Sequence, residues 1–408
     1  MKKIAPFVFA LFTLASCGIS SESSSEVSSS TSSSFASTGS FNWSSFPSSP
    51  KQTTYTNPFS FSTGVGQSTI YEGIADPYVL HADDGYFYLV CSNTYAHAAG
   101  KGRFFDYGPI WRSADLQEWT YVTSVFAGRE SEAFSWGSVP EGVSLQVNAP
   151  SLNKIGDNYV FYYTLTGGYD QNPGIGYAYA KSMNGPWILG GELFRCNDIG
   201  VFNSSDQDVY VEDGKVYMVF GSGDGIYLIR LTDDGFGLYG GLSNAMATKK
   251  WLAGWDNALG NNTNNYEGAN LIKRDGRYYL FLSTGGWDGG KSSLYHTLVC
   301  SSASLLGPYS DSLGRDMKSA YEGDDVILPD PENVSGTGHT CVYRDDQGTD
   351  WIFYHGYDQI GRADGNIRTL FMDKLIYDET TKMPAIKGKT ASAGEQFGPY
   401  VEVCANEN

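Results

Sequence analysis

Five short segments of this chain share one pattern, a polar turn followed at once by an aromatic-rich strand. In one copy, Leu271 and Ile272 end a strand, Asp275-Gly276 forms the turn, and residues 278–283 form the next strand. Asp-Gly suits this turn because glycine takes a positive φ angle without steric cost. The copies recur roughly every 60 to 70 residues, as in a radial repeat of antiparallel sheets, and lie at residues 84–90, 156–163, 213–222, 275–283 and 348–355. The sequence therefore predicts an all-β fold, a five-bladed β-propeller.

The predicted propeller takes up most of the 408 residues, from residue 57 to residue 397. A second folded domain has no room beside it. Residues 398–408 are expected to form a C-terminal tail. Residues 18–56 are rich in serine and carry little apolar surface to offset the entropy of ordering them, so we expect a disordered tether there.

The N-terminal segment has the pattern of an export signal. Two lysines precede an apolar run from Ile4 to Ala15, which is too short to remain as a membrane span. The run ends in Leu14-Ala15-Ser16-Cys17-Gly18, which resembles the bacterial lipobox, and the resemblance implies that residues 1–17 hold the signal and that Cys17 becomes lipidated. The alternative is an ordinary signal peptide with a chance cysteine. We expect an exported protein held at the cell surface or envelope, with the lipid anchor as its contact with the membrane.

The net charge limits the classes of possible binding partner, and the cysteine content limits the possible disulfides. The formal net charge of −18 argues against nucleic acid and acidic polysaccharide, because both favour basic surfaces. The aromatic content of 15% suits propeller strands and also a sugar-stacking cleft, and composition does not separate the two uses. The cysteines after the lipobox are odd in number and lack metal-site spacing, so we expect most to be buried and free, although export permits a disulfide; they are Cys91, Cys196, Cys300, Cys341 and Cys404.

Three carboxylates occupy comparable places ahead of three of the repeated hairpins. Asp76 stands before the first hairpin, Asp206 before the third and Glu267 before the fourth. An Asp-Pro pair such as Asp76-Pro77 is by itself a common turn. At inner-strand positions of three blades, however, the three carboxylates would converge on the propeller axis. Such convergence gives glycoside hydrolysis what it needs, an acid for the leaving oxygen and a base for water.

These residues occur in motifs that resemble glycoside hydrolase family 43, over residues 57 to 387. The resemblance implies an inverting enzyme in which Asp76, in Ala75-Asp76-Pro77, is the general base. Asp206, in Asn203-Ser204-Ser205-Asp206, would raise the pKa of the acid and orient it, with Asn203 at the substrate. Glu267, followed by Gly268, would be the general acid.

The chain departs from the family pattern at two places. Asn148-Ala149-Pro150 stands where the family usually has Trp-Ala-Pro, so Asn148 would meet the substrate without an aromatic ring. Gln207 follows Asp206 where the family usually has proline, which leaves Asp208 open as the functional carboxylate. Strand alternation would nevertheless point Asp208 to the face opposite Asp206.

Further motifs resemble the arabinan-degrading members of the family. Gly336-Thr337-Gly338-His339 resembles a motif whose histidine lies near the axis and helps hold a metal ion, usually calcium, largely through water. Water-rich coordination suits calcium better than a transition metal, and no organic cofactor is expected. The alternative is that His339 is packed in the protein interior and binds no ligand. Arg368 resembles an arginine that reaches the substrate from the last blade, and its alternative is a solvated strand residue.

The resemblance implies an exported enzyme, expected to be monomeric, that acts on arabinose-containing plant polysaccharide such as arabinan, arabinoxylan or a related oligosaccharide. Endo action on α-1,5-L-arabinan is the specific expectation. The same three carboxylates would also serve an exo-acting α-L-arabinofuranosidase or a β-xylosidase, because loop shape decides between cleft and pocket. A carbohydrate-binding propeller without catalysis is a rival from another class, and a retaining fructan-type propeller is a further one whose signatures are absent.

Overall fold

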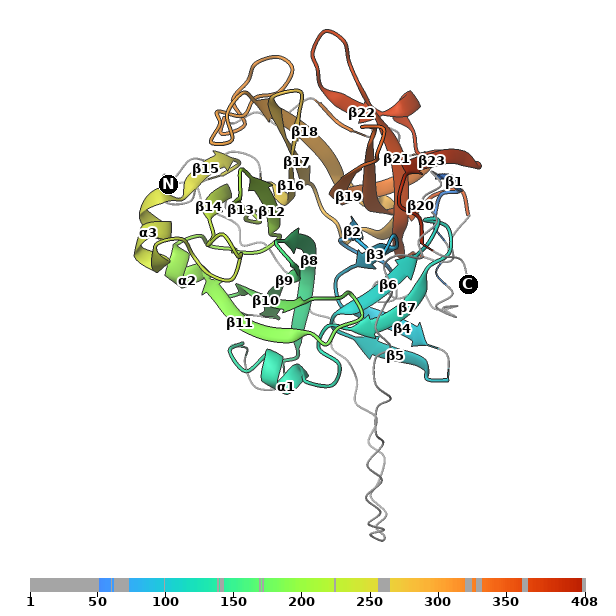
Figure 1. Cartoon of the computed structure of the whole chain (residues 1–408). Helices are drawn as coiled ribbons and strands as arrows, with labels where there is room; N and C mark the ends of the chain where they lie inside the picture. Colours follow the sequence, from blue (N-terminus) through green and yellow to red (C-terminus); the bar gives the residue numbers. More distant parts are fainter. Residues whose placement is uncertain are drawn as a thin grey trace. The chain divides into compact units, whose positions relative to one another are not determined.

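The computed structural model describes residues 51–405, apart from residues 60, 62–72, 99, 138, 140–142, 169, 171, 224, 256–264, 320–324, 328–331 and 362–365. Its strands form five sheets of three or four strands arranged around a centre, as Figure 1 shows. The predicted five-bladed β-propeller is thus confirmed. The predicted lipidation site Cys17 and the tether up to residue 50 lie outside the described residues.

Each blade is one antiparallel sheet in chain order. From the inner strand outward, blade 1 consists of β2 (Tyr78–His81), β3 (Phe87–Val90), β6 (Pro109–Ser113) and β7 (Thr120–Ser124). Blade 2 consists of β8 (Leu145–Ile155), β9 (Asn158–Gly167), β10 (Gly174–Ala180) and β11 (Ile188–Arg195). Blade 3 consists of β12 (Asp208–Glu212), β13 (Lys215–Phe220), β14 (Ile226–Arg230) and β15 (Lys250–Ala253).

The last two blades complete the ring. Blade 4 consists of β16 (Glu267–Arg274), β17 (Arg277–Thr284) and β18 (His296–Ser302). Blade 5 consists of β19 (Val334–Arg344), β20 (Asp350–Asp358), β21 (Arg368–Tyr377) and β22 (Pro384–Ile386). A separate hairpin of β4 (Thr94–Ala98) and β5 (Gly102–Asp106) is inserted between the second and third strands of blade 1. The inner strands touch in the cyclic order β2, β8, β12, β16, β19 and back to β2, which closes the ring.

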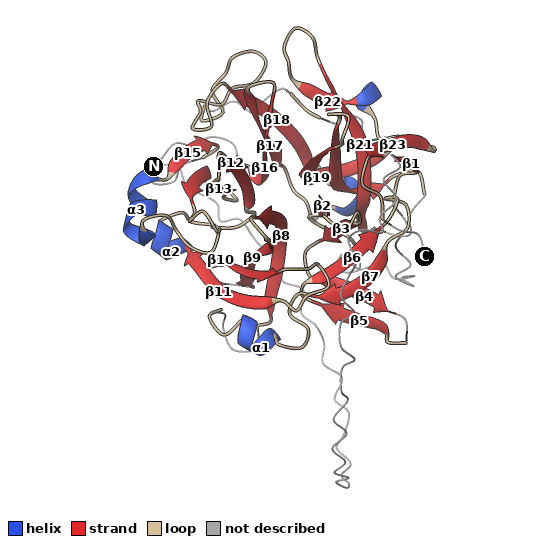
Figure 2. Cartoon of the chain, in the orientation of Figure 1, coloured by secondary structure: helices blue, strands red, loops and turns tan. Residues whose placement is uncertain are grey.

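Helices are short, and the described α-helices lie at the outer edge of the ring of blades, as Figure 2 shows. They are α1 (Glu130–Ala133), α2 (Cys196–Ile199) and α3 (Gly241–Thr248), with 3-10 turns at η3 (Gly290–Ser292) and η4 (Lys387–Lys389). None of the helices in the described part of the chain has the length and apolar character that a membrane span requires.

The predicted turns connect the inner strand of each blade to the second strand. The Asp-Gly turn between β16 and β17 has φ angles of 49° at Asp275 and 79° at Gly276, and the turn between β12 and β13 has 51° at Asp213 and 71° at Gly214. Both angles are positive, as a two-residue hairpin turn with the right-handed twist of its strands requires. The turn chemistry in the sequence therefore fixes the register of these hairpins.

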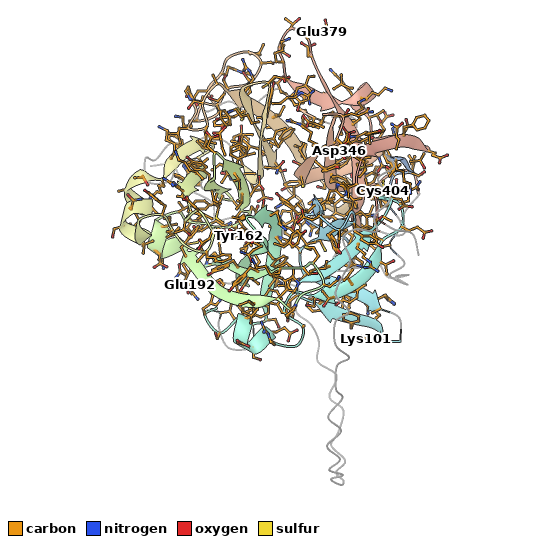
Figure 3. All side chains as sticks on the ribbon, in the orientation of Figure 1. Lys101, Tyr162, Glu192, Asp346, Glu379 and Cys404 are labelled. Carbon is orange, nitrogen blue, oxygen red and sulfur yellow. The ribbon has the colours of Figure 1, made fainter. Side chains whose placement is uncertain are left out.

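Five hydrophobic clusters hold neighbouring blades together among the described residues. Phe161 of blade 2, for example, packs in one cluster with Tyr88 of blade 1, whereas Phe353 of blade 5 packs with Phe87 of blade 1 in another. Figure 3 shows side chains filling the space between the sheets, including Tyr162, which is 0% exposed. The five cysteines after the lipobox are buried and free, as expected.

The folded part extends beyond the predicted range of 57–397 at both ends. β1 (Lys51–Tyr55), expected to be tether, pairs with β23 (Gln396–Val401), which reaches into the expected tail. Thr53 and Tyr55 are buried, and Tyr55 packs edge-on against Trp351 of blade 5 at a centroid distance of 5.9 Å. β1 therefore belongs to the folded part, and the boundary predicted at residue 57 wrongly assigned it to the tether.

Candidate active site

A pocket with a volume of ≈ 280 Å³ is lined by residues of all five blades. It lies at the end of the ring where β2, β12 and β16 begin. The seven side chains predicted for catalysis, substrate binding and metal binding all line it: Asp76, Asn148, Asn203, Asp206, Glu267, His339 and Arg368. The fold therefore brings together the residues that the sequence motifs had pointed to.

A left-handed backbone position recurs at the pocket in every blade. The φ angle is 55° at Asp76, 46° at Ala149, 55° at Asp206, 59° at Gly268 and 52° at His339. Such angles are uncommon for residues other than glycine and concentrate at functional sites. In β8, β16 and β19 the same positions coincide with a shift in the pairing register. The chain bends there, so that this residue, the one before it, or both line the pocket.

Gly268 shows why a small residue must follow Glu267. A Cβ atom at position 268 would come within 3.2 Å of both Cα and Nδ1 of His339, tighter than ordinary contact. The backbone N–H of Gly268 also donates to Oδ2 of Asp206 at 3.1 Å. Glycine at this position therefore lets blades 3, 4 and 5 meet closely around the carboxylates.

Asp76 lies among groups that favour its ionised form. Its Oδ1 is 3.4 Å from Nδ1 of His339 and 3.5 Å from a guanidinium nitrogen of Arg368, and its Oδ2 accepts a hydrogen bond from Ser92. Burial by itself would raise the pKa of Asp76, but attraction to His339 and to Arg368 outweighs burial and holds the pKa well below its ordinary value. Asp76 is therefore a carboxylate at neutral pH.

His355 on β20 supports Asp76 from behind. Its Nδ1 accepts the backbone N–H of Asp76 at 3.0 Å, so the ring proton is on Nε2. Burial lowers the pKa of His355 to about 4, more than the nearby carboxylate of Asp76 raises it, so the ring is neutral at pH 7. The contact of 3.4 Å between Nδ1 and Oδ1 of Asp76 is therefore not an ion pair. His355 fixes the position of Asp76 without adding charge.

Glu267 is in the opposite protonation state. Burial, followed by repulsion from Asp206, raises the pKa of Glu267 to about 7. Ser222 donates to Oε2 at 2.8 Å and Tyr295 donates to Oε1 at 2.7 Å, and both hydrogen bonds lower the pKa by a smaller amount. The carboxyl group of Glu267 is thus largely protonated below neutral pH, while its two oxygens are held in place.

Asp206 interacts electrostatically with both of the other carboxyl groups. Burial and then repulsion from Asp76 raise the pKa of Asp206 to about 7, against the N–H of Gly268 that lowers it. Its Oδ2 is 4.0 Å from Nδ1 of His339. Negative charge on Asp206 raises the pKa of Glu267 in turn, so the arrangement fits an acid-tuning carboxylate.

Asp208, the alternative to Asp206, lies away from the pocket in the buried interior of the ring. Its carboxylate accepts hydrogen bonds from Tyr78 at 3.0 Å, from the side chain of Asn270 at 2.9 Å and from the backbone of Leu271 at 2.8 Å. It is 2% exposed and does not contribute to the described lining of the pocket. Asp208 joins blades 1, 3 and 4, and Asp206 is the carboxylate that faces the pocket.

His339 faces the carboxylates with its Nδ1, and its backbone N–H donates to Ser283 at 2.8 Å. Among the described residues, no group of three or more His, Cys, Asp and Glu side chains is arranged to hold a metal ion. A metal at this place would have to be held by His339 with water completing its shell. A shell made mostly of water oxygens suits a hard cation such as calcium, with the imidazole of His339 as its one nitrogen ligand.

Sequence reasoning missed many of the residues that shape the pocket or its immediate support, including five that contact Asp76 or Glu267 or present an indole ring. These five are Ser92, Ser222, Trp287, Tyr295 and His355. Four of them lie on second strands or on the loops that follow those strands, and Tyr295 directly precedes a third strand, so their approach to the inner strands depends on the folded blade. The sequence carried a signal for Ser222 and His355, because they end two of the repeated hairpin segments, 213–222 and 348–355, but that pattern marks the strand and not the contact with a carboxylate.

The geometry combines an ionised carboxylate and a protonated carboxyl group in one pocket. The ionised Asp76 can accept a proton from water, and the protonated Glu267 can donate one to an oxygen. Two environments that push two carboxyl groups to opposite protonation states are the pattern of general acid–base catalysis.

Comparison with known proteins agrees with this geometry. The sequence profile described as "Glycosyl hydrolases family 43" matches residues 67–381. The "Probable arabinan endo-1,5-alpha-L-arabinosidase A" of Aspergillus flavus is 28% identical over 300 residues, covering 71% of this chain and 84% of the relative. The "Extracellular exo-alpha-(1->5)-L-arabinofuranosidase ArbA" of Cellvibrio japonicus is 26% identical over 297 residues, covering 67% of this chain and 80% of the relative. Among solved structures, the Cellvibrio cellulosa alpha-L-arabinanase complexed with arabinohexaose has a TM-score of 0.65 at 22% identity, covering 81% of this chain and 99% of the other, and supports the fold.

Proposed function

This chain belongs to glycosyl hydrolases family 43 and is a glycoside hydrolase, and we propose that it cleaves α-1,5-linked L-arabinan within the polysaccharide chain. The observation that carries the proposal is the pairing of an ionised Asp76 with a protonated Glu267 in a single pocket. The choice of arabinan follows the names of relatives that match more than half of this chain.

In the proposed reaction, one water molecule attacks the anomeric carbon as the glycosidic bond breaks, with inversion at that carbon. Asp76 accepts a proton from the attacking water. Glu267 donates its proton to the departing sugar oxygen, so protons balance between the two carboxyl groups. Negative charge on Asp206 raises the pKa of Glu267, and His355 and Ser92 hold Asp76 in position.

Endo and exo action are separated by the products from linear arabinan. Sizing of the products over time should show a ladder of oligosaccharides from the first minutes if cleavage is internal. Arabinose alone from the start would replace the endo proposal with the exo activity that the Cellvibrio japonicus relative is named for. Release of sugar from xylan but not from arabinan would overturn the proposed substrate, and an Asp76→Ala protein is the inactive control.

We further propose that calcium binds at His339, largely through water. When bound, the ion would supply positive charge to the pocket that Asp76 and Asp206 line. His339 would hold it, and the carboxylates would carry the proton transfers themselves.

We also propose export and lipid anchoring through Cys17. The support is the apolar run that ends in Leu14-Ala15-Ser16-Cys17-Gly18, together with relatives named extracellular. Mass spectrometry of the N-terminal peptide from the expressing bacterium should show a diacylglycerol-modified Cys17. A Cys17→Ser protein should move from the membrane fraction to the soluble fraction, and unchanged membrane retention would contradict the anchor.

A further inference from the structure

Most of the residues that line the pocket have polar side chains, but one large aromatic ring is accessible in it. Trp287 lies on the loop between β17 and β18, lines the pocket and is 40% exposed. The other aromatic ring of Phe, Tyr or Trp type in the described lining belongs to Tyr295, which is 2% exposed and donates its hydroxyl to Glu267. Trp287 therefore offers the indole face that a ligand entering the pocket can reach.

The loop that carries Trp287 is held in place by hydrogen bonds. The hydroxyl of Tyr357 on blade 5 donates to the backbone oxygen of Trp287 at 3.0 Å, and Ser293 donates to the backbone oxygen of Gly286 at 2.7 Å. A Cβ atom at position 290, where φ is 58°, would lie 2.0 Å from the side-chain nitrogen of Asn366. The close packing of this loop against blade 5 means that the ring is positioned before any ligand arrives, which limits the entropy lost on binding.

Arg368 connects the ring to the catalytic carboxylate. Its guanidinium carbon lies over the Trp287 ring at 4.8 Å from the centroid, and a guanidinium nitrogen of the same side chain is 3.5 Å from Oδ1 of Asp76. The cation covers part of the indole and keeps it next to Asp76. The Trp287 ring therefore lies on the Asp76 side of the pocket, next to the place where the attacked sugar must sit.

The position of Trp287 in the ring of blades defines what faces it. The loop belongs to blade 4 and rests on blade 5, and in a ring of five the blade opposite that junction is blade 2. Blade 2 contributes polar groups to the lining, among them Asn148 and Gln146. A sugar between the two sides would meet an apolar wall on one side and hydrogen-bonding groups on the other. The carbon-bound hydrogens on one face of a furanose ring would pack against the apolar wall formed by Trp287. The hydroxyl groups of the sugar would form hydrogen bonds with the polar groups of blade 2.

We propose that Trp287 is a sugar-stacking residue that determines affinity and specificity at the pocket, a role that rests on the proposed function and adds a binding contact to it. Trp287 would bind the apolar face of the sugar ring next to Asp76. Its ligand class is a neutral oligosaccharide with an accessible C–H face.

The test measures binding without turnover. A Glu267→Gln protein keeps the size of the acid but cannot donate its proton, so calorimetry with arabinohexaose reports affinity alone. Adding Trp287→Ala to this protein should raise the Kd about tenfold or more, the size of effect typical of truncating a buried aromatic anchor. Trp287→Phe, which keeps an aromatic face, should lose much less. Phe397→Ala is the matched control, because Phe397 is a 74% exposed aromatic residue on β23, outside the described lining of the pocket.

Unchanged affinity in the Trp287→Ala protein would overturn the stacking role, provided that thermal unfolding shows a folded protein. Equal losses in Trp287→Ala and Trp287→Phe would also overturn it, because they would indicate a role in loop packing. If the Glu267→Gln protein itself fails to bind arabinohexaose, the proposed substrate is wrong and the role of Trp287 is decided with xylohexaose. Equal binding of xylohexaose with and without Trp287 would then overturn the inference.

Discussion

The phenol ring of Tyr295 lies parallel to the imidazole of His355, with ring centroids 5.6 Å apart and an interplanar angle of 7°. Tyr295 donates its hydroxyl to Glu267 at 2.7 Å, and His355 accepts the backbone N–H of Asp76 at 3.0 Å. One stacked pair thus connects the proposed acid to the proposed base. The separation of the two carboxyl groups is therefore set by packed rings from blades 4 and 5 rather than by surface loops.

The first prediction concerns the hydrogen bond between Tyr295 and Glu267. The hydroxyl of Tyr295 stabilises the ionised form of Glu267, and so lowers its pKa against burial and Asp206. Tyr295→Phe should therefore raise the pKa of Glu267 and move the alkaline limb of the pH–rate profile upward by about one pH unit, since a hydrogen bond to a charged group contributes about 1.5–3 kcal/mol. A downward shift would contradict the hydrogen-bond assignment.

The second prediction removes the charge on Asp206, and the expected shift in the pKa of Glu267 is opposite to that of the first prediction. Repulsion from Asp206 raises the pKa of Glu267, so Asp206→Asn should lower that pKa. The alkaline limb should move to lower pH by on the order of one unit, together with a loss of rate. The two variants at Tyr295 and Asp206 therefore shift the same limb in opposite directions.

Asp208 is the matched control for this experiment. Its carboxylate accepts hydrogen bonds from Tyr78, Asn270 and Leu271 in the interior of the ring. Asp208→Asn would turn an amide donor toward these donors, so the melting temperature should fall while the alkaline limb of the surviving activity stays in place. A moved limb in Asp208→Asn and an unmoved one in Asp206→Asn would exchange their roles.

The sequence predicts the fold through local chemistry that repeats. Three of the repeated turns are Asp-Gly, such as Asp275-Gly276, and the other two are glycine-containing polar turns; five hairpins of this kind at a steady spacing indicate a radial fold. Asp76, Asp206 and Glu267 could be predicted because each stands just before a hairpin, and equivalent positions in a ring converge on its axis.

The support for these carboxylates could not be predicted in the same way. Tyr295 reaches Glu267 from the residue just before a third strand, and Ser92 reaches Asp76 from the loop after a second strand. Neither contact depends on a local sequence pattern, because blade twist and packing between blades decide which side chains meet. The pairing of β1 with β23 likewise joins segments more than 300 residues apart, which neither segment's composition indicates.

The third prediction concerns the acidic limb. Attraction to Arg368 is one of the effects that hold the pKa of Asp76 below its ordinary value. Arg368→Gln should raise that pKa, so the acidic limb should move to higher pH by about one unit. Arg344→Gln is a suitable control, because Arg344 pairs at 2.6 Å with Asp350, a carboxylate outside the described pocket lining. If both variants shift the limb equally, Arg368 does not act through Asp76.

The fourth prediction concerns calcium. If His339 holds the ion, dialysis against a chelator should lower activity or melting temperature, and added calcium should restore it. His339→Ala should behave like the chelated protein and should not respond to calcium. His81→Ala should keep the response, because His81 stacks on Phe87 at 4.4 Å and lies outside the described pocket lining. If elemental analysis finds no metal in the untreated protein and the chelator has no effect, His339 does not hold a metal ion.

The last prediction separates the acid from the base through leaving groups of different quality. Protonation by Glu267 matters most when a sugar hydroxyl departs, and it matters little for an activated aryl arabinoside, whose phenolate departs unaided. Asp76 must activate water in both cases. General acid or base assistance typically contributes ~10²–10⁴-fold. Glu267→Ala should therefore lose activity on arabinan by this factor and keep far more on the aryl substrate, whereas Asp76→Ala should be severely impaired on both. Because Asp76 is ionised and Glu267 protonated in the same pocket, the reverse outcome, with Asp76→Ala sparing the aryl substrate, would require both assignments of protonation state to be exchanged.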